Sequence, residues 1–126
     1  MVFGLRKLFG IGAGGDLSIS PEDAQALMAG SDALVIDVRE PAEVARSGKV
    51  AGSRNIPLGD LERHASPHSE HHDGAFEPNR PIVCYCASGM RSAKAAEILS
   101  HLGYTRAYNL GGFSAWVAAG GATERG

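Results

Sequence analysis

A cysteine and an arginine with four residues between them stand out in the segment VCYCASGMRS, residues 83–92. Cys86 ends a run of strand-forming residues, and an alanine-rich helix is predicted to follow. The small residues at 87–89 allow a tight turn whose backbone N–H groups would converge on the sulfur, next to the N-terminus of that helix. This field and the charge of Arg91 should lower the thiol pKa below its ordinary value of about 8.5 and favour the reactive thiolate. We therefore predict that Cys86 is a catalytic nucleophile.

The length of this turn bears on whether the thiolate handles phosphorus or sulfur. Tyrosine-phosphatase-type enzymes place one residue more between the cysteine and the arginine, which leaves room for a phosphate group. The shorter loop from Ala87 to Arg91 can surround the single outer sulfur of a persulfide but would crowd a phosphate. A phosphatase or arsenate reductase is therefore the less favoured interpretation.

The other cysteine, Cys84, lies within the predicted strand beside Ile82 and Val83, as buried structural thiols commonly do. Two cysteines placed two residues apart on a strand would form a disulfide only with strain. With only two cysteines in the chain, a disulfide framework is not expected, and a reducing compartment is the simpler interpretation.

Strands and helices are predicted to alternate along the chain, which indicates an α/β fold with a central, mostly parallel sheet and helices on both faces. Ser20 and Pro21 are typical of a helix start, and Gly30 of its end. The predicted strands are 17–19, 33–38, 53–57, 81–86 and 106–110. The predicted helices are 20–30, 41–48, 59–65, 91–102 and 113–120, and residues 67–81 are a predicted loop.

Composition and charge exclude several classes of function. The 126 residues suffice for one domain, with 44% apolar and 21% charged residues. Twelve basic and 14 acidic residues give a net charge of −2, so no basic surface for nucleic acid or anionic lipid is expected. No apolar run is long enough to span a bilayer, and residues 1–15 lack the unbroken apolar stretch of a signal peptide. We therefore expect a cytoplasmic protein without a transmembrane segment.

Two further patterns have plain explanations. Gly10, Gly12 and Gly15 match the spacing of a dinucleotide-binding loop, but no buried strand precedes them and no helix starts directly after them, so a linker is favoured. A second group of residues has helical spacing that could suit zinc: His64, His68, His71 and His72. Pro67 would break such a helix, and a solvated loop is favoured. We expect neither a metal nor a cofactor.

Four segments in order resemble the single-domain rhodaneses, from about Leu17 to Gly121. They are IDVREPAE, with Asp37 and Arg39; SGKVAGSRNIPL; the loop VCYCASGMRS; and the closing segment LGYTRAYNLGGFSAW. One departure is Lys49, where the family usually has a histidine. This position lies outside the loop.

The resemblance implies a rhodanese-like fold and a sulfurtransferase that works through a persulfide. The Cys86 thiolate would take the sulfane sulfur of a small anionic donor such as thiosulfate, and cyanide or a thiol, including a protein thiol, would then accept it. The residues implied to hold the persulfide form the loop: Ala87, Ser88, Gly89, Met90, Arg91 and Ser92. Arg91 would attract the donor or, equally, form a structural pair with Asp37 or Glu40. Asp37 and Arg39 would support the loop, and Ser92 would cap the helix or donate to the loop.

A module of the same fold that carries a persulfide for a partner protein, or that only docks on one, is the alternative. We expect a flexible or amphipathic tail at residues 1–16, a rhodanese domain at 17–122, and a monomer or weak dimer. The apolar positions of the tail (Val2, Leu5, Leu8 and Phe9) could share one face of a short helix that docks on another surface.

Overall fold

The computed structural model describes residues 17–126. The glycine pattern at residues 10–15 and the predicted apolar face of the tail lie outside the described residues, so both stay predictions.

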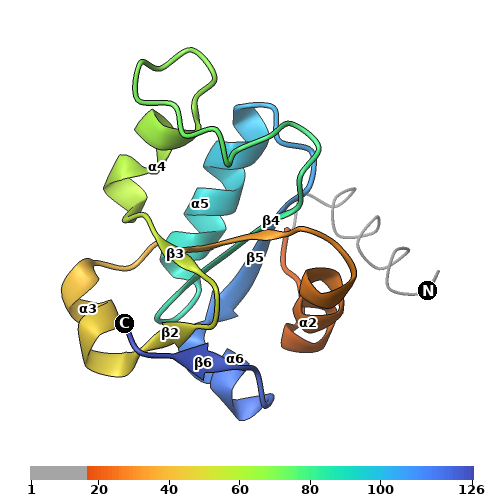
Figure 1. Cartoon of the computed structure of the whole chain (residues 1–126), viewed down its shortest axis with the longest axis vertical. Coiled ribbons are helices and arrows are strands. Elements are labelled where there is room, and N and C mark those ends of the chain that lie inside the picture. The colour runs from red at the N-terminus through yellow and green to blue at the C-terminus, as the bar shows by residue number, and fades with distance from the viewer. Residues whose placement is uncertain (1–16) are drawn as a thin grey trace.

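A four-stranded parallel sheet forms the centre of the molecule, in the order β3-β1-β4-β5 (Figure 1). Its strands are β1 (Leu34–Asp37), β3 (Arg54–Asn55), β4 (Ile82–Cys86) and β5 (Ala107–Gly112). β4 lies inside the sheet, between β1 and β5. The predicted parallel sheet is therefore confirmed.

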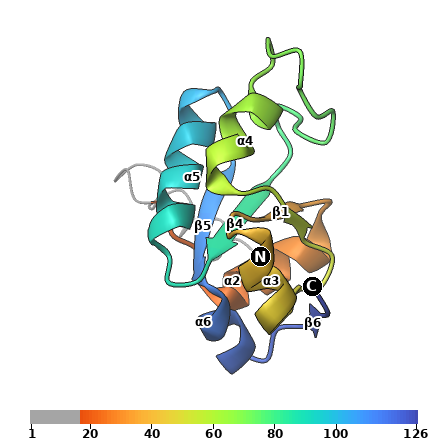
Figure 2. The same cartoon turned by 90° about the vertical axis from the view of Figure 1, so that its left-hand side faces the viewer.

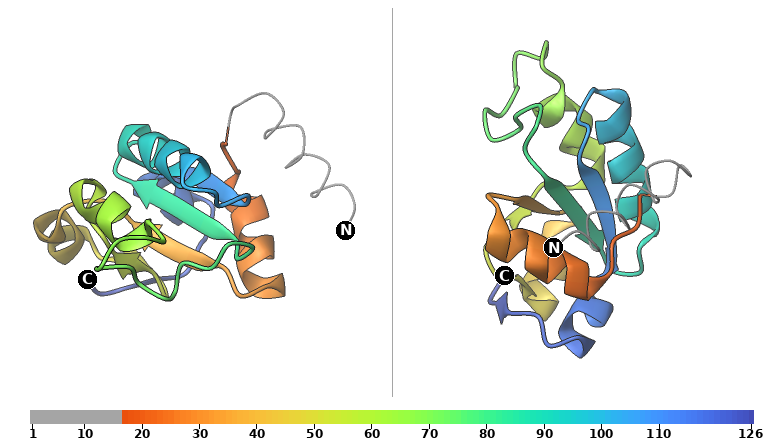
Figure 3. Two further views of the ribbon diagram at one scale, coloured as in Figure 1. Left: turned by 90° about the horizontal axis from the view of Figure 1, so that it is seen from above. Right: turned by 90° about the vertical axis from the view of Figure 1, so that its right-hand side faces the viewer.

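Helices cover both faces of the sheet, as predicted (Figure 3). α4 (Leu58–Ala65) and α5 (Met90–His101) pack on one face, and α2 (Pro21–Gly30) and α6 (Phe113–Ala118) on the other. The short α3 (Pro41–Ser47) lies beside β2 (Lys49–Val50), at the same end of the molecule as the chain's C-terminus (Figure 2).

Alternation along β4 explains how one strand serves two cores. Ile82, Cys84 and Cys86 belong to the buried cluster under α4 and α5, whereas Val83 and Tyr85 belong to the cluster under α2 and α6. All five residues are fully buried. A strand buried on both faces has a continuous apolar sequence rather than an alternating one, as IVCYC has.

Local signals in the sequence explain the helix boundaries. The Ser20 hydroxyl accepts a hydrogen bond from the Asp23 N–H at 3.0 Å, and α2 ends at Gly30, both as predicted. α3 ends before Gly48, whose φ of 83° favours glycine.

Three features differ from the prediction. The strand predicted at residues 17–19 is only an isolated bridge between Ser18 and Asn109. β2 and β6 (Thr123–Glu124) form a small antiparallel pair that was not predicted. Gly111 and Gly112, expected to form a turn, instead end β5, where a register shift pairs them with Tyr85 and Cys86. Among residues 17–126, no helix is both long and apolar enough to cross a lipid bilayer.

Candidate active site

The carboxyl ends of three neighbouring strands bring the predicted site residues close together. Asp37 at the end of β1 pairs with Tyr85 of β4, and Cys86 at the end of β4 pairs with Gly112 of β5. In open parallel sheets, ligands bind at this end of the strands. The loop after β4 then turns into α5.

The sulfur of Cys86 lies inside a turn of backbone N–H groups. Gly89 N–H donates to Sγ at 3.0 Å, Ser92 N–H does so at 3.4 Å, and the Ser92 hydroxyl lies 3.4 Å from Sγ. Burial raises the pKa of the Cys86 thiol, but the hydrogen bonds from Ser92, Gly89 and Ser88 outweigh burial, so the pKa is lowered. The arrangement therefore stabilises a thiolate without a histidine base.

Glycine makes this turn possible at two positions. Gly89 precedes α5 with a φ of 102°, in the left-handed region, which lets the chain reverse from the loop into the helix. At Gly112, a Cβ atom would lie 2.5 Å from the carbonyl oxygen of Ala87. The end of β5 therefore passes directly against the loop, and only a residue without a side chain fits there.

Asn109 on β5 holds the far side of the loop, a role that was not predicted. The Ser92 hydroxyl donates to Asn109 Oδ1 at 2.6 Å, and Gly111 N–H donates to the same oxygen at 2.9 Å. Asn109 Nδ2 also donates to the Gly89 carbonyl at 3.4 Å. The residue lies in the segment YNLGG, two positions before the glycine pair, which was the available signal.

Arg91 forms its ion pair with Glu43 of α3, not with Asp37 or Glu40 as the structural alternative supposed. Its two terminal nitrogens donate to Glu43 Oε2 at 2.8 Å and to Oε1 at 2.9 Å. Glu43 is also fixed by a capping box, in which its side chain accepts from the Glu40 N–H at 3.1 Å. These contacts, with that to Arg91 the largest cause, lower the pKa of Glu43 to about 2.

Asp37, at the end of β1, and Arg39, just before α3, form a buried ion pair. Arg39 Nη2 donates to Asp37 Oδ2 at 2.7 Å, and the guanidinium lies 4.8 Å from the centre of the Phe113 ring. Arg39 also donates to the Ser47 hydroxyl and the Gly48 carbonyl, which end α3. The pair thus fixes the helix that carries Glu43, and Arg39 also lies 5.6 Å from the centre of the Tyr85 ring, directly before Cys86.

Cys84 lies on the same face of β4 as Cys86, and both thiols are free. Burial and, to a smaller extent, the charge of Cys86 raise the pKa of Cys84 to about 12. Cys84 therefore stays a neutral thiol in the core, as expected for a structural cysteine.

Of the four histidines with possible zinc spacing, His64 lies in the last turn of α4, and His68, His71 and His72 follow the helix. α4 ends at Ala65, two residues before Pro67, as expected from the proline. Within residues 17–126, no three His, Cys, Asp or Glu side chains lie close enough together to hold a metal ion.

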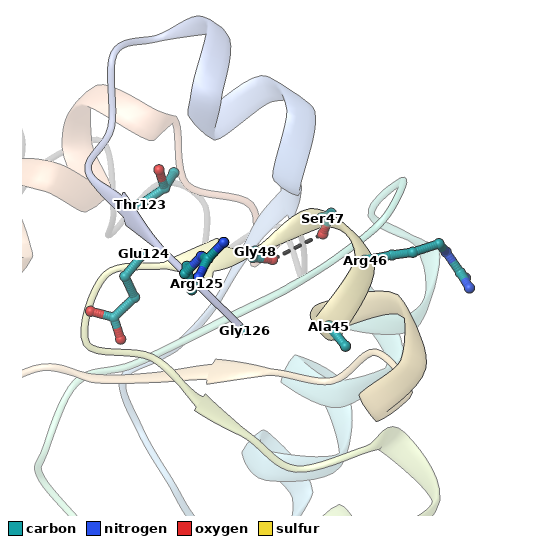
Figure 4. A pocket seen from close by; sticks show the side chains of 8 residues that line it. All are labelled: Ala45, Arg46, Ser47, Gly48, Thr123, Glu124, Arg125 and Gly126. Carbon is teal, nitrogen blue, oxygen red and sulfur yellow. Dashed lines mark hydrogen bonds between the residues drawn. The ribbon is translucent and has the colours of Figure 1, made fainter.

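A hollow of about 610 Å³ lies away from the cysteine loop, between residues 45–48 and 123–126 (Figure 4). Its two arginines, Arg46 and Arg125, extend to different sides and do not converge on one point (Figure 4). None of residues 86–92 lines this hollow. We place the candidate active site at the loop because the loop surrounds the sulfur of Cys86.

Comparisons with known proteins identify the family of the chain. The rhodanese-like domain family model matches residues 20–119, so the chain belongs to the rhodanese-like domain family. A sulfurtransferase of Allochromatium vinosum is 35% identical over 98 residues, covering 77% of this chain and 83% of that protein. A putative mitochondrial thiosulfate sulfurtransferase of Schizosaccharomyces pombe is 36% identical over 90 residues, covering 67% of this chain.

The match covers 61% of the Schizosaccharomyces pombe protein and 60% of YqhL, an uncharacterized protein of Bacillus subtilis. Among solved structures, a Rhodopseudomonas palustris protein of unknown function, described as a possible tyrosine phosphatase, superposes with a TM-score of 0.77. It is 38% identical, and the match covers 85% of this chain and 83% of that one.

Proposed function

We propose that the protein is a sulfurtransferase that carries sulfane sulfur on Cys86. In the first half-reaction the Cys86 thiolate attacks the outer sulfur of a donor such as thiosulfate. The new bond joins Sγ to that sulfur, the S–S bond of the donor breaks, and sulfite leaves with the bonding electron pair. In the second half-reaction an acceptor, cyanide or a thiolate, attacks the outer sulfur, and Cys86 recovers its electron pair as a thiolate.

The observation that carries the proposal is the short turn around Sγ. Four residues separate Cys86 from Arg91, and the N–H groups of Gly89 and Ser92 are directed at the sulfur. Donors fixed in this way stabilise negative charge on the nucleophile and on the persulfide without reorganising during the reaction. The names of the sulfurtransferase relatives support the same chemistry.

The test is persulfide formation. After incubation with thiosulfate and removal of the excess, intact-mass measurement should show one added sulfur, which peptide mapping should place on Cys86. Cys84→Ala should retain this sulfur and Cys86→Ser should lose it. Subsequent addition of cyanide should release thiocyanate in equal amount.

The Rhodopseudomonas palustris protein is described as a possible tyrosine phosphatase. An assay with an aryl phosphate therefore distinguishes sulfur transfer from phosphatase activity at this site. We expect no hydrolysis, because the loop crowds a phosphate. Turnover of the aryl phosphate without persulfide on Cys86 would replace sulfur transfer by phosphatase chemistry as the function of this site.

A further inference from the structure

The loop around Cys86 has a single basic side chain, and that side chain is already neutralised. Residues 87–90 and Ser92 are uncharged, so Arg91 is the only cation of the loop. Its guanidinium meets the Glu43 carboxylate through two parallel hydrogen bonds of 2.8 and 2.9 Å. Bidentate pairs of this kind fix the geometry of both partners.

Glu43 is fixed in place independently of Arg91. The capping box of α3 binds its side chain to the Glu40 N–H, and the C-terminal end of the same helix is fixed by Arg39. A carboxylate anchored in this way cannot easily turn aside when a negatively charged ligand approaches. The net charge that Arg91 and Glu43 together present to a donor is therefore close to zero.

Among residues 17–126, the nearby cations do not replace the charge that is cancelled, and the Glu40 carboxylate adds a negative charge close to Arg91. Arg39 is matched by Asp37, with which it forms a buried ion pair. Lys94 is exposed one helical turn beyond Met90, where water and salt screen its charge. The exposed part of the loop is neutral, at Ala87, at Ser88 and at Met90, whose side chain is 80% exposed.

Charge then becomes the difference between donors. Thiosulfate has two negative charges and must approach a thiolate that has one. Methanethiosulfonate offers the same kind of sulfane sulfur, but a methyl group replaces one charged oxygen, so its anion has a single charge. With no net positive charge from the loop, the repulsion costs the dianion more.

We propose that the Glu43–Arg91 ion pair sets the donor selectivity of this site, favouring sulfane-sulfur donors with at most one negative charge over dianionic thiosulfate. The inference rests on the proposed function of Cys86. For a singly charged donor, the thiolate attacks the outer sulfur, the bond from that sulfur to the rest of the donor breaks, and a sulfinate or thiolate leaves with the electron pair.

The test compares thiosulfate and methanethiosulfonate in wild type and in Glu43→Gln. Glutamine can keep the capping box, but it leaves the charge of Arg91 unmatched. We expect kcat/KM for thiosulfate to rise about threefold to tenfold at low ionic strength, and kcat/KM for methanethiosulfonate to rise less, because a dianion gains twice as much from one added positive charge. The quantity to report is the ratio of the two kcat/KM values, since the intrinsic reactivity of each donor cancels between variants.

Two further variants control for net charge and for the origin of the gain. Glu97→Gln on the exposed side of α5 changes the net charge equally and should leave the ratio unchanged. In the double variant Glu43→Gln/Arg91→Gln, the gain for thiosulfate should disappear. The melting temperature of each variant shows whether it is folded.

If the ratio of the two kcat/KM values in folded Glu43→Gln equals that of the wild type, the ion pair is purely structural and the inference is overturned. This includes the case in which both values fall by the same factor. These outcomes differ from a failure of the proposed function, in which neither donor would leave a sulfur on Cys86 in the wild type.

Discussion

The Ser92 hydroxyl lies between the Cys86 sulfur, at 3.4 Å, and Asn109 Oδ1, at 2.6 Å. It has only one proton to donate. While Cys86 is a neutral thiol, the Ser92 hydroxyl donates this proton to Asn109 Oδ1, and its oxygen can accept a hydrogen bond from the Cys86 S–H. Once Cys86 is ionised, a hydroxyl proton turned to the sulfur would stabilise the thiolate, and Asn109 Oδ1 would still accept from Gly111 N–H.

We predict that Ser92→Ala raises the pKa of Cys86 while leaving the fold intact. The hydrogen bond from the Ser92 hydroxyl is the largest of the contributions that lower this pKa, so its loss removes a donor that favours the thiolate. Because the thiolate is the active form, the rate rises with pH through this pKa. The midpoint of the pH–rate profile should therefore move to higher pH in the variant.

Ser100→Ala, on the exposed side of α5, is the matched control and should not move the midpoint. An unshifted profile in folded Ser92→Ala would mean that the backbone N–H groups alone set the pKa.

The connection from β4 to α5 is the element whose size and contacts define the site. A glycine inserted between Gly89 and Met90 should widen the turn and move the N–H groups away from the sulfur. A misplaced donor of this kind commonly lowers the rate by about two to three orders of magnitude, so persulfide formation should fall steeply. The measurement pairs thiosulfate turnover with inhibition by arsenate, which should strengthen in the wider turn. Unchanged sulfur transfer in the insertion variant would show that the size of the loop does not determine the chemistry of the site.

The close passage of β5 against this turn gives a second prediction for the same element. In Gly112→Ala, the new methyl group would lie 2.5 Å from the Ala87 carbonyl oxygen, a backbone atom, so the loop or the end of β5 must shift. We expect at least a tenfold loss of kcat/KM.

Gly59→Ala on α4 is the comparison variant, because a Cβ atom there meets nothing within 4 Å. It should have the wild-type rate. A fully active Gly112→Ala would show that the site tolerates displacement of the loop.

Local signals explain which elements could be predicted from the sequence. Ser20, Gly30 and Gly48 define helix boundaries, and IVCYC is a buried strand whatever its neighbours are. β2 and β6 have two residues each and form only because distant parts of the chain meet. Two residues are too few to show the alternation of apolar and polar residues that would predict a strand.

The same distinction holds within the site. The turn around Cys86 is local and was predicted, whereas the Glu43 partner of Arg91 and the Asn109 partner of Ser92 lie 48 and 17 residues away. Choosing Glu43 over Glu40 requires knowing how α3 is oriented, and finding Asn109 requires the register of β5.

At the scale of the whole molecule, the segment after α6 is hydrogen-bonded both to α6 and to the residue after β2. The Ala122 carbonyl accepts hydrogen bonds from the buried Trp116 Nε1 at 2.9 Å and from the Ala51 N–H at 3.0 Å. We predict that removing residues 122–126 lowers the free energy of unfolding by about 1–3 kcal/mol, since a buried indole N–H would lose its acceptor. Denaturant unfolding measures the difference.

Removing only residues 125–126 keeps that acceptor and should cost less. Equal stability of both truncated proteins and the full chain would show that the Ala122 carbonyl contributes nothing.

Residues 1–15 should be dispensable for chemistry, because the resemblance to the family begins only after them. A protein starting at Asp16 should have the wild-type kcat/KM with thiosulfate and cyanide. A large loss of turnover in this protein, if it is still folded by circular dichroism, would assign the tail to the active site.

The two outer strands of the sheet bear on how the molecule can meet other chains. Along β5, Asn109 N–H donates to the Leu17 carbonyl at 2.8 Å, and its carbonyl accepts from Ile19 N–H at 2.9 Å, so the middle of this edge is already covered. The opposite edge strand, β3, is only two residues long and contains Arg54. Short, charged or covered edges resist pairing with a foreign strand.

A protein acceptor would therefore have to approach the mouth of the cysteine loop rather than extend the sheet. The contact of residues 17–19 with β5 also limits how far the N-terminus can be shortened. Removing the chain through Ile19 would expose the edge of β5, and we expect the protein then to aggregate more readily.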